Sequence, residues 1–600
     1  MNRRWNKSWV FAAVASLALA SGAAAQSVWT NQAGGDFNTA VNWDPNGVPG
    51  AGANAWLSGA AGIPGAMTIS LSAAASVDRL WAHLGPIPEL TFDLAGYQLT
   101  ALTTNAATPL SKDSSNIDGA FRFLDDWTAS GNMIVTSSAP GGVLQGNVLR
   151  GATLATAGPV NLTFAGSNLF VNLNGTSSHN YLFEESTGTV TFAAGVTVRS
   201  SRPFHVGNAR NGGGALGDPN VTWLITDPGT TFTNINQFMY VGRGAGQTTL
   251  VVSNQASVYV GSQVWAGENA ATTASWGTNG LGTILVTGTG SRFEASNNIN
   301  LGTHMGNEEG TAGGFLFVTN GGLVRTSVRI VLGEARSHAD VGTNAYALGR
   351  IHVSGAGSVA EIGTDWFIGM AGRGEAFVTD GGSVTSANIR IARGDTTQSA
   401  ADKWTNAAPY GLLVISNQNS VVRSRDLELG ASHSPNAQAH LIVADKAHLD
   451  IQRTDGNAQI TLRASPDVRM TVSDALVTSS NLTANAGTTI RLELGGPSDD
   501  ALIQLSGVLA RNGTPNLEIG LLPGFSANVG SDIVLFSFAS ASGAFNGWTS
   551  GEDYVIGDYT FNYRETAGDI YLYTVIPEPG TLGLIAAGLG LAAILRRRRR

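Results

Sequence analysis

Three acidic residues are the strongest candidates for chemistry in this chain. Glu268, Glu334 and Asp395 each follow a glycine that ends an apolar segment. Paired carboxylates can cleave glycosidic bonds, and clustered Asp oxygens can bind Ca²⁺. The matching positions in related segments are Thr303, Met370 and Ala431. A catalytic row should not lose its acids in this way, so we expect solvated corner residues and no catalytic site.

Histidine and cysteine usage predicts no metal site and no cofactor. Of the nine histidines, His433, His440 and His448 lie nearest to one another, and their spacing matches no common ligand pattern. The chain has no cysteine, which excludes disulfides, zinc–thiolate sites and thiol nucleophiles. We find no nucleophile-elbow serine, phosphate-binding loop or dinucleotide fingerprint.

The middle of the chain is a repeat array. Six stretches align, for example "TLVVSNQASVYVGSQVWAGE" from Thr249 and "FLFVTNGGLVRTSVRIVLGE" from Phe315. Each has an alternating strand, a turn of Asn, Asp, Gly or Gln, two shorter strands and a final glycine. The apolar anchor positions are 225, 252, 286, 318, 353, 378, 415 and 443, a mean step of about 31 residues. A constant core with variable joins is typical of a solenoid.

Three short strands per repeat predict an all-β, right-handed parallel β-helix. We expect the anchors, such as Val252, Val286 and Val318, to stack about 4.8 Å apart in an internal ladder. One corner should be formed by turn residues that tolerate positive φ, namely Asp227, Asn254, Asn320, Asp380 and Asn417. A β-sandwich array or a propeller is the alternative, although propeller blades need four strands and about 40 residues or more.

The ends of the array are predicted to be β caps. "SVWTNQAGGDFNTAVNW", with Trp29 and Trp43, followed by Pro49, resembles the start of β-solenoid surface proteins. These rings either stack on sugars or cover the open end of the solenoid, and we favour the second interpretation. Residues 484–575 resemble the C-terminal β region of exported passenger proteins. The expected divisions are 1–25, 26–100 (cap and first coils), 101–483 (repeats), 484–575 (cap) and 576–600.

The first 25 residues have the features of a secretory signal peptide. Arg3, Arg4 and Lys7 precede the apolar run "WVFAAVASLALA", and an A-x-A site places cleavage between Ala25 and Gln26. The residues after Arg4 are not the hydrophobic pair of a twin-arginine signal, which favours the general secretory route. An uncleaved anchor is the alternative.

The last 24 residues combine a turn, an apolar segment and a basic cluster. Pro577, Glu578 and Pro579 precede the sixteen-residue segment Gly580–Leu595. As a helix it would extend roughly 24 Å, short of a hydrocarbon core of about 30 Å unless arginine stems reach the interface. The basic cluster is Arg596, Arg597, Arg598, Arg599 and Arg600. We therefore predict one transmembrane helix with its arginine end in the cytoplasm.

In this order the three parts resemble the PEP-CTERM sorting domain. The resemblance covers about 25 residues of the chain and implies recognition and processing by an exosortase. It also implies export across the inner membrane of a Gram-negative bacterium that makes exopolysaccharide, with residues 580–595 holding the chain in the membrane before removal. Retention of the tail as a permanent anchor is the alternative.

These features together predict a non-enzymatic exported protein of the cell surface or extracellular matrix, associated with exopolysaccharide. The net charge of −9 argues against a nucleic-acid partner. Two alternatives stay open because a fold does not fix a function. One is a β-helix polysaccharide lyase or hydrolase, and the other is an adhesin for a glycan or a cell.

Overall fold

The described part of the chain is all-β apart from one short 3₁₀ helix, and the chain divides into two units, Met1–Arg202 and Pro203–Arg600. The computed structural model describes residues 26–45, 47–58, 66–77, 79–83, 89–101, 121–124, 131–146, 149–150, 160–173, 180–182, 188–208, 220–244, 246–269, 279–304, 310–335, 345–393, 409–430, 436–465, 467–495 and 502–576.

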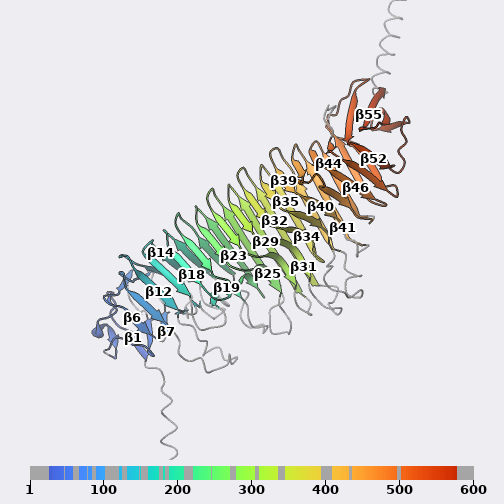
Figure 1. The fold of residues 1–600 in the computed structure, drawn as a ribbon. Coiled ribbons are helices and arrows are strands. Elements are labelled where there is room, and N and C mark those ends of the chain that lie inside the picture. The colour runs from blue at the N-terminus through green and yellow to red at the C-terminus, as the bar shows by residue number, and fades with distance from the viewer. Residues whose placement is uncertain are drawn as a thin grey trace, which may run out of the picture. The chain divides into compact units, whose positions relative to one another are not determined.

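The second unit is a parallel β-solenoid in which each coil contributes one strand to each of three long sheets (Figure 1). Sheet 1 contains β20 (Asn220–Ile225), β23 (Gly246–Ser253), β26 (Asn279–Thr287), β29 (Gly310–Thr319), β32 (Ala345–Ser354), β35 (Arg373–Thr379), β38 (Tyr410–Ile415), β41 (Gln438–Ala444), β44 (Val468–Ser473), β47 (Thr489–Leu494) and β50 (Asn516–Leu521). Sheet 2 contains β21 (Thr231–Asn234), β24 (Ser257–Val260), β27 (Arg292–Ala295), β30 (Leu323–Thr326), β33 (Val359–Ile362), β36 (Ser383–Thr385), β39 (Val421–Ser424), β42 (His448–Ile451), β45 (Leu476–Ser479), β48 (Ile503–Leu505) and β51 (Asp532–Ser537). Sheet 3 contains β19 (Phe204–Asn208), β22 (Met239–Arg243), β25 (Val264–Asn269), β28 (Ile299–His304), β31 (Ile330–Ala335), β34 (Asp365–Ile368), β37 (Asn388–Ile391), β40 (Asp426–Leu429), β43 (Gln459–Leu462), β46 (Asn481–Asn485), β49 (Val508–Asn512) and β52 (Ser540–Gly543).

The predicted internal ladder is confirmed residue by residue. In sheet 1 each anchor pairs with the anchor of the next coil, in the order Ile225, Val252, Val286, Val318, Val353, Val378, Ile415 and Val443. All eight side chains are fully buried. The alternating pattern of each strand therefore sends one apolar row inward, and parallel stacking extends that row along the unit. The right hand of the solenoid stays a prediction.

The Asn and Asp corner between sheets 1 and 2 is also confirmed. The five expected residues adopt φ values from 49° to 77°, a left-handed conformation that Asn and Asp tolerate: Asp227, Asn254, Asn320, Asp380 and Asn417. Their side chains link neighbouring coils, since Asn254 Nδ2 donates to Asp227 Oδ1 at 2.9 Å. The corner is thus a hydrogen-bonded ladder of its own.

From β23 to β39, successive coils alternate at this corner between a turn of three residues and a longer turn. The turn has three residues at 254–256, 320–322 and 380–382, four at 288–291 and 355–358, and five at 416–420. In each of these three-residue turns, one amide donates to a buried serine in the next coil. Gln255 N–H donates to Ser291, Gly321 N–H to Ser358, and Gly381 N–H to Ser420, at 3.0–3.1 Å. The longer turn of the next coil thus contains the serine hydroxyl that accepts this hydrogen bond, so the backbone amide keeps a partner.

Sheets 3 and 1 meet along two rows of glycine. Sheet 3 contributes glycines with φ of 64–80°, namely Gly242, Gly267, Gly302, Gly333 and Gly369. Sheet 1 contributes an in-register row of Gly282, Gly314, Gly349, Gly374 and Gly411. A Cβ atom on Gly302 would lie 1.9 Å from Leu348 O, and one on Gly314 would lie 2.1 Å from Gly302 N. We call these two rows the glycine seam. The final glycine of each repeat therefore serves close backbone packing as well as positive φ.

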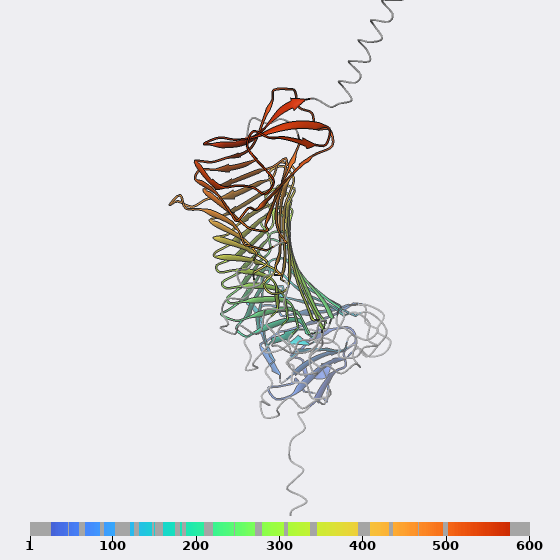
Figure 2. The same ribbon diagram turned by 90° about the vertical axis from the view of Figure 1, so that its right-hand side faces the viewer.

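Parallel pairing continues past residue 484, so the sequence-based cap boundary falls inside the stacked coils. β46 pairs with β49, and β49 with β52. The antiparallel strands that cover this end are β53 (Asp553–Ile556), β54 (Tyr559–Glu565) and β55 (Asp569–Ile576), and β55 also pairs antiparallel with β51 (Figure 2). They remove an open sheet edge that could otherwise pair with another chain.

The first unit is built from the same kind of parallel pairing. One sheet contains β13 (Leu149–Arg150), β10 (Phe121–Leu124), β7 (Arg79–His83), β4 (Asn54–Ser58), β1 (Gln26–Trp29) and β3 (Trp43–Asp44). A second row contains β2 (Gly35–Asp36), β5 (Met67–Ser70), β8 (Leu90–Asp93), β11 (Gly131–Thr136), β14 (Val160–Ala165) and β17 (Gly188–Ala193). A third row contains β6 (Ala75–Val77), β9 (Gln98–Ala101), β12 (Gly142–Gly146), β15 (Leu169–Leu173) and β18 (Thr197–Ser200). The remaining elements are β16 (Asn180–Leu182) and the 3₁₀ helix η1 (Ala40–Asn42).

Trp29 and Trp43 are buried in this unit, as the capping interpretation requires. They are 3% and 0% exposed, and their rings meet edge to face at 5.1 Å. Both indole nitrogens donate to backbone oxygens, Trp29 to Asn31 and Trp43 to Phe37. Neither ring presents a face to solvent, so sugar stacking on them is excluded.

No helix within the described ranges is long and apolar enough to span a membrane. The predicted transmembrane segment Gly580–Leu595 lies outside the described residues.

Candidate functional site

Glu268 and Glu334 lie in one column of sheet 3, but they are buried. Strand pairing places Glu268 opposite Thr303 and Thr303 opposite Glu334, so the two carboxylates are two rungs apart, about 9.6 Å. The residues are only 1% and 4% exposed. The expectation of solvated corner residues is wrong for these two, because the sheet 1 strands β29 and β32 pack against β25 and β31, which carry them.

Arg393 fills the position of this column in the coil of β37. Ile391 pairs with Ile368, which places Ala392 opposite Gly369. Ala392 has a φ of 56°, and its N–H donates to Ile368 O at 2.7 Å. Ala392 therefore takes the place of the final glycine in this coil, and the sequence alignment on Gly394 is two residues out. Asp395 itself lies outside the described residues.

An arginine that the sequence analysis missed neutralises Glu268. Arg243 is one rung away in the register, and its Nε lies 2.9 Å from Glu268 Oε2. A buried carboxylate needs such a partner, because an isolated buried charge is strongly unfavourable. Glycosidic cleavage needs carboxylates that a sugar can approach. Glu268 and Glu334 are both buried, and Glu268 is paired with Arg243.

Of the three histidines His433, His440 and His448, the two that are described, His440 and His448, lie in different sheets. His440 on β41 contacts Asp467 Oδ1 at 3.4 Å, while His448 on β42 lies 3.0 Å from Thr478 Oγ1 in a different sheet. Burial lowers the pKa of His448, with Asp450 opposing and Arg423 adding to the shift. His433 lies outside the described residues. Across the ranges that are described, no group of three His, Asp or Glu side chains could hold a metal ion.

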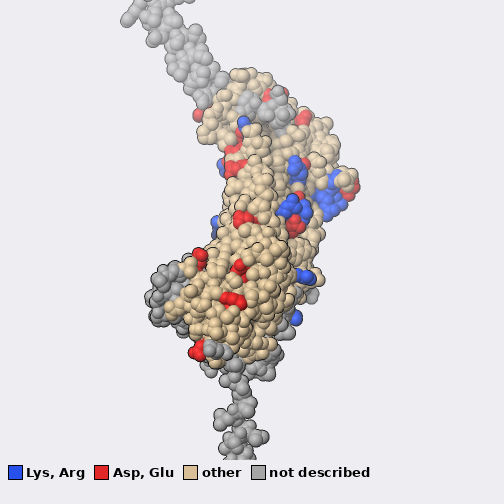
Figure 3. All heavy atoms as spheres, turned by 90° about the vertical axis from the view of Figure 1, so that its left-hand side faces the viewer, with Lys and Arg blue, Asp and Glu red and all other residues tan. Residues whose placement is uncertain are grey.

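Many of the outward charges are paired between neighbouring coils. Arg325 and Glu361 meet at 2.6 Å on sheet 2, and Arg463 and Glu428 meet at 2.7 Å on sheet 3. On the face drawn in Figure 3, blue and red groups are small; some lie side by side and others stand alone, on a surface that is largely neither. Such pairs fix the register of stacked coils and leave little net field for a charged ligand.

Glu375 on β35 is a buried carboxylate that is held by two arginines. Burial raises its pKa, but hydrogen bonds and charge from Arg350 and Arg373 outweigh burial and hold the pKa below its usual value. Arg350 Nε donates to Glu375 Oε2 at 2.8 Å, and Arg373 Nε donates to Oε1 at 2.7 Å. This arginine–glutamate–arginine group links the neighbouring strands β32 and β35.

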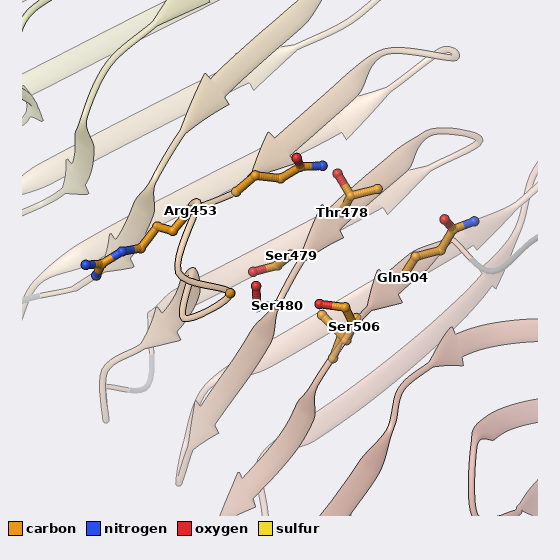
Figure 4. Close-up of a pocket in the computed structure, with 9 residues that line it drawn as sticks. Arg453, Thr478, Ser479, Ser480, Gln504 and Ser506 are labelled. Atoms are coloured by element: carbon orange, nitrogen blue, oxygen red, sulfur yellow. The ribbon is translucent and has the colours of Figure 1, made fainter.

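A groove opens at the corner between sheets 2 and 3, over three successive coils (Figure 4). Its volume is about 510 Å³. The lining residues are Gln452, Arg453, Gly456, Thr478, Ser479, Ser480, Gln504, Leu505 and Ser506. Sequence reasoning missed this groove. The available signal was the join after β42, which is much longer than the corresponding joins of the following coils.

The predicted sorting residues lie at the end of the chain. Residues 575–600 match the PEP-CTERM protein-sorting motif. This stretch contains Pro577, Glu578 and Pro579, the apolar segment and all five terminal arginines, and residues 577–600 lie outside the described residues. The motif implies an exosortase-sorted protein that is exported across the membrane of a Gram-negative bacterium to its surface. The comparisons with curated proteins and with solved structures each find no match.

At the other end, the predicted signal-peptide cleavage site borders the first described strand. β1 begins at Gln26, and Ala25 lies outside the described residues. Cleavage between them stays a prediction.

Proposed function

We propose that this protein is a non-enzymatic structural component of the cell surface or extracellular matrix, a right-handed β-solenoid rod associated with exopolysaccharide. The observation that carries the proposal is the sorting motif at 575–600, which begins within β55, the strand that covers the last coils of the solenoid unit. A rod needs continuous ladders, covered ends and an address for export.

The internal organisation supports a mechanical role. The anchor ladder, the Asn/Asp corner and the glycine seam each repeat over five or more coils. Stability in such an array comes from each coil and its contacts with its neighbours, so the unit can be long without a large globular core. The surface displays hydroxyl and amide groups between paired charges, which suits contact with a hydrated polysaccharide matrix.

Processing of the tail is part of the proposal. If Pro577-Glu578-Pro579 directs cleavage, the protein outside the cell should lack residues 580–600. Intact-mass measurement on surface and secreted material tests this. Arg600 present in that material would leave only the permanent-anchor alternative.

The absence of catalysis is the second testable part. Incubation of the full chain with acidic and neutral polysaccharides should yield no new reducing ends and no unsaturated products. Activity that disappears in a Glu268→Gln, Glu334→Gln double variant, with unchanged melting, would overturn the proposal in favour of a lyase or hydrolase. The variant Asp395→Asn extends the test to the acid that lies outside the described residues.

A further inference from the structure

The groove exists because one join overhangs its neighbours. The join from β42 to β43 has seven residues, 452–458, whereas the following coils make the same corner with one residue, Ser480, and with two, 506–507. The long join therefore forms a wall above two tight corners. Gly456 has a φ of 72°, and its N–H donates to Arg453 O at 3.1 Å, which folds the join back on itself.

Ion pairs hold this wall and remove its charge from the groove. Arg453 lies 3.4 Å from Asp426 and 3.1 Å from Asp455. Figure 4 shows the guanidinium group of Arg453 pointing away from Ser479, Ser480 and the other labelled residues. The one cation on the rim is therefore balanced by two carboxylates and does not face the interior.

What remains facing the groove is neutral and capable of hydrogen bonding. Thr478 and Gln504 occupy adjacent rungs of sheet 2, about 4.8 Å apart. Thr478 Oγ1 donates to Asp450 Oδ1 at 2.8 Å, which fixes its orientation. Ser479, Ser480 and Leu505 are nearly buried and form the floor. In the same outward row the preceding residues are Arg423 and Asp450, so the row changes from charged to neutral where the groove begins.

We propose that this groove binds a short segment of a neutral, hydroxyl-rich glycan, one or two sugar residues long. A hydroxyl both donates and accepts, and a primary amide presents a donor and an acceptor side by side, which matches neighbouring hydroxyl groups of a sugar. The volume lies in the range of pockets that hold small organic molecules, about 300–1,000 Å³. Balanced charge disfavours an ionic ligand, and the serine, threonine and glutamine side chains in the lining favour a hydrogen-bonding ligand over a lipid. The inference rests on the proposed association with polysaccharide.

Binding of defined oligosaccharides to the full chain tests the groove. The probes are maltotetraose, cellotetraose and mannotetraose, with tetragalacturonate as the anionic comparison, followed by saturation-transfer NMR and calorimetry. Gln504→Leu removes a donor and an acceptor at similar volume, and Ser506→Arg fills the groove with a long side chain. Gln438→Leu makes the first change at an exposed strand position outside the groove.

At least one neutral probe should bind the parent protein saturably. Its affinity should fall about fivefold or more in Gln504→Leu. Binding should be undetectable in Ser506→Arg and unchanged in Gln438→Leu. All three variants should have the same melting temperature as the parent protein, which distinguishes loss of the site from loss of the fold. No binding by any neutral probe, equal binding to Ser506→Arg, or preference for tetragalacturonate would overturn the proposal.

Failure of this inference is distinguishable from failure of the proposed function. Fractionation of cells shows whether the exported protein is retained with exopolysaccharide. Retention that is unchanged in Ser506→Arg contradicts the groove but leaves the matrix role intact. Oligosaccharide binding at the groove by a protein that is never found with exopolysaccharide contradicts the matrix role but supports the groove.

Discussion

Gly314→Ala should destabilise the solenoid unit through the glycine seam. The new Cβ would lie 2.1 Å from Gly302 N and 2.3 Å from Ala266 O, whereas Cβ contacts below 3.0 Å are essentially not found. Both partners are backbone atoms, so no rotamer change relieves the clash. β29 is hydrogen-bonded to β26 and to β32, and a shift of the strand would disturb both neighbouring coils.

The expected magnitude follows from two opposing effects. Overpacking of a filled interior typically costs about 1–3 kcal/mol, and rigid backbone partners place this site at the upper end. Replacing Gly by Ala also restricts the unfolded chain, which stabilises a protein by about 0.4–1 kcal/mol where the site is open. The net expectation is a loss of about 2 kcal/mol in the free energy of unfolding.

Gly520→Ala is the matched control. Gly520 is also in a sheet 1 strand, but its Cβ would find the nearest atoms, Arg491 Nη2 and Glu493 Cγ, at 3.8 Å, an ordinary contact. Only the unfolded-chain effect applies there, so this variant should melt at the same temperature as the parent or slightly above it.

Circular dichroism during heating gives the melting temperature of each variant. Hydrogen exchange with mass spectrometry shows where protection is lost, which matters because stacked coils need not unfold as one unit. We expect Gly314→Ala to lower the melting temperature and to lose protection first in residues 299–319. Equal melting shifts for both variants, or protection lost only far from the seam, would refute the close-packing argument.

Three further predictions concern buried charge, the anchor ladder and pH. Arg243→Leu should lower the free energy of unfolding by about 3–5 kcal/mol, because it leaves the buried Glu268 carboxylate without its arginine. Arg325→Leu breaks an exposed pair and should lower it by less than about 1 kcal/mol. Similar melting shifts for the two variants would contradict the burial argument. Val318→Asp places a carboxylate in the fully buried ladder and should lower the free energy of unfolding by several kcal/mol. Gln438→Asp, at an exposed strand position, should leave it nearly unchanged. Denaturant titration of both variants measures the difference. Burial lowers the pKa of His352, with Asp380 opposing and Arg350 adding to the shift, so the folded state resists protonation of this side chain. Its contribution to stability should therefore be complete above the ordinary histidine pKa of about 6.5 and decline as the pH falls below that value. His352→Gln should make the decline of melting temperature below pH 6.5 less steep, and an unchanged slope would show that other groups cause it.

The sequence predicted the coils because each coil repeats the same local choices. Alternation in each strand separates an inward face from an outward one, and the anchors therefore identify the ladder without any knowledge of distant contacts. Asn and Asp at the turns are local as well, since their tolerance of positive φ belongs to the residue itself. The sorting tail can be read for the same reason, because it is a linear order of a turn, an apolar segment and a basic cluster.

The sequence did not predict the glycine seam, the buried acids or the groove. A pattern within one coil cannot show that Gly302 lies against a strand about 45 residues further on. This close packing of sheet 3 against sheet 1 decides which outward positions are buried. The alignment placed the final glycine of this coil at Gly394, whereas Ala392 adopts the conformation that the sequence rule assigns to glycine. The groove arises from a difference between coils, a long join beside two short ones. Composition and periodicity thus determined the strands and their inner faces. The packing of different coils against one another decided which outward positions are exposed, because burial depends on neighbours that the local sequence does not specify.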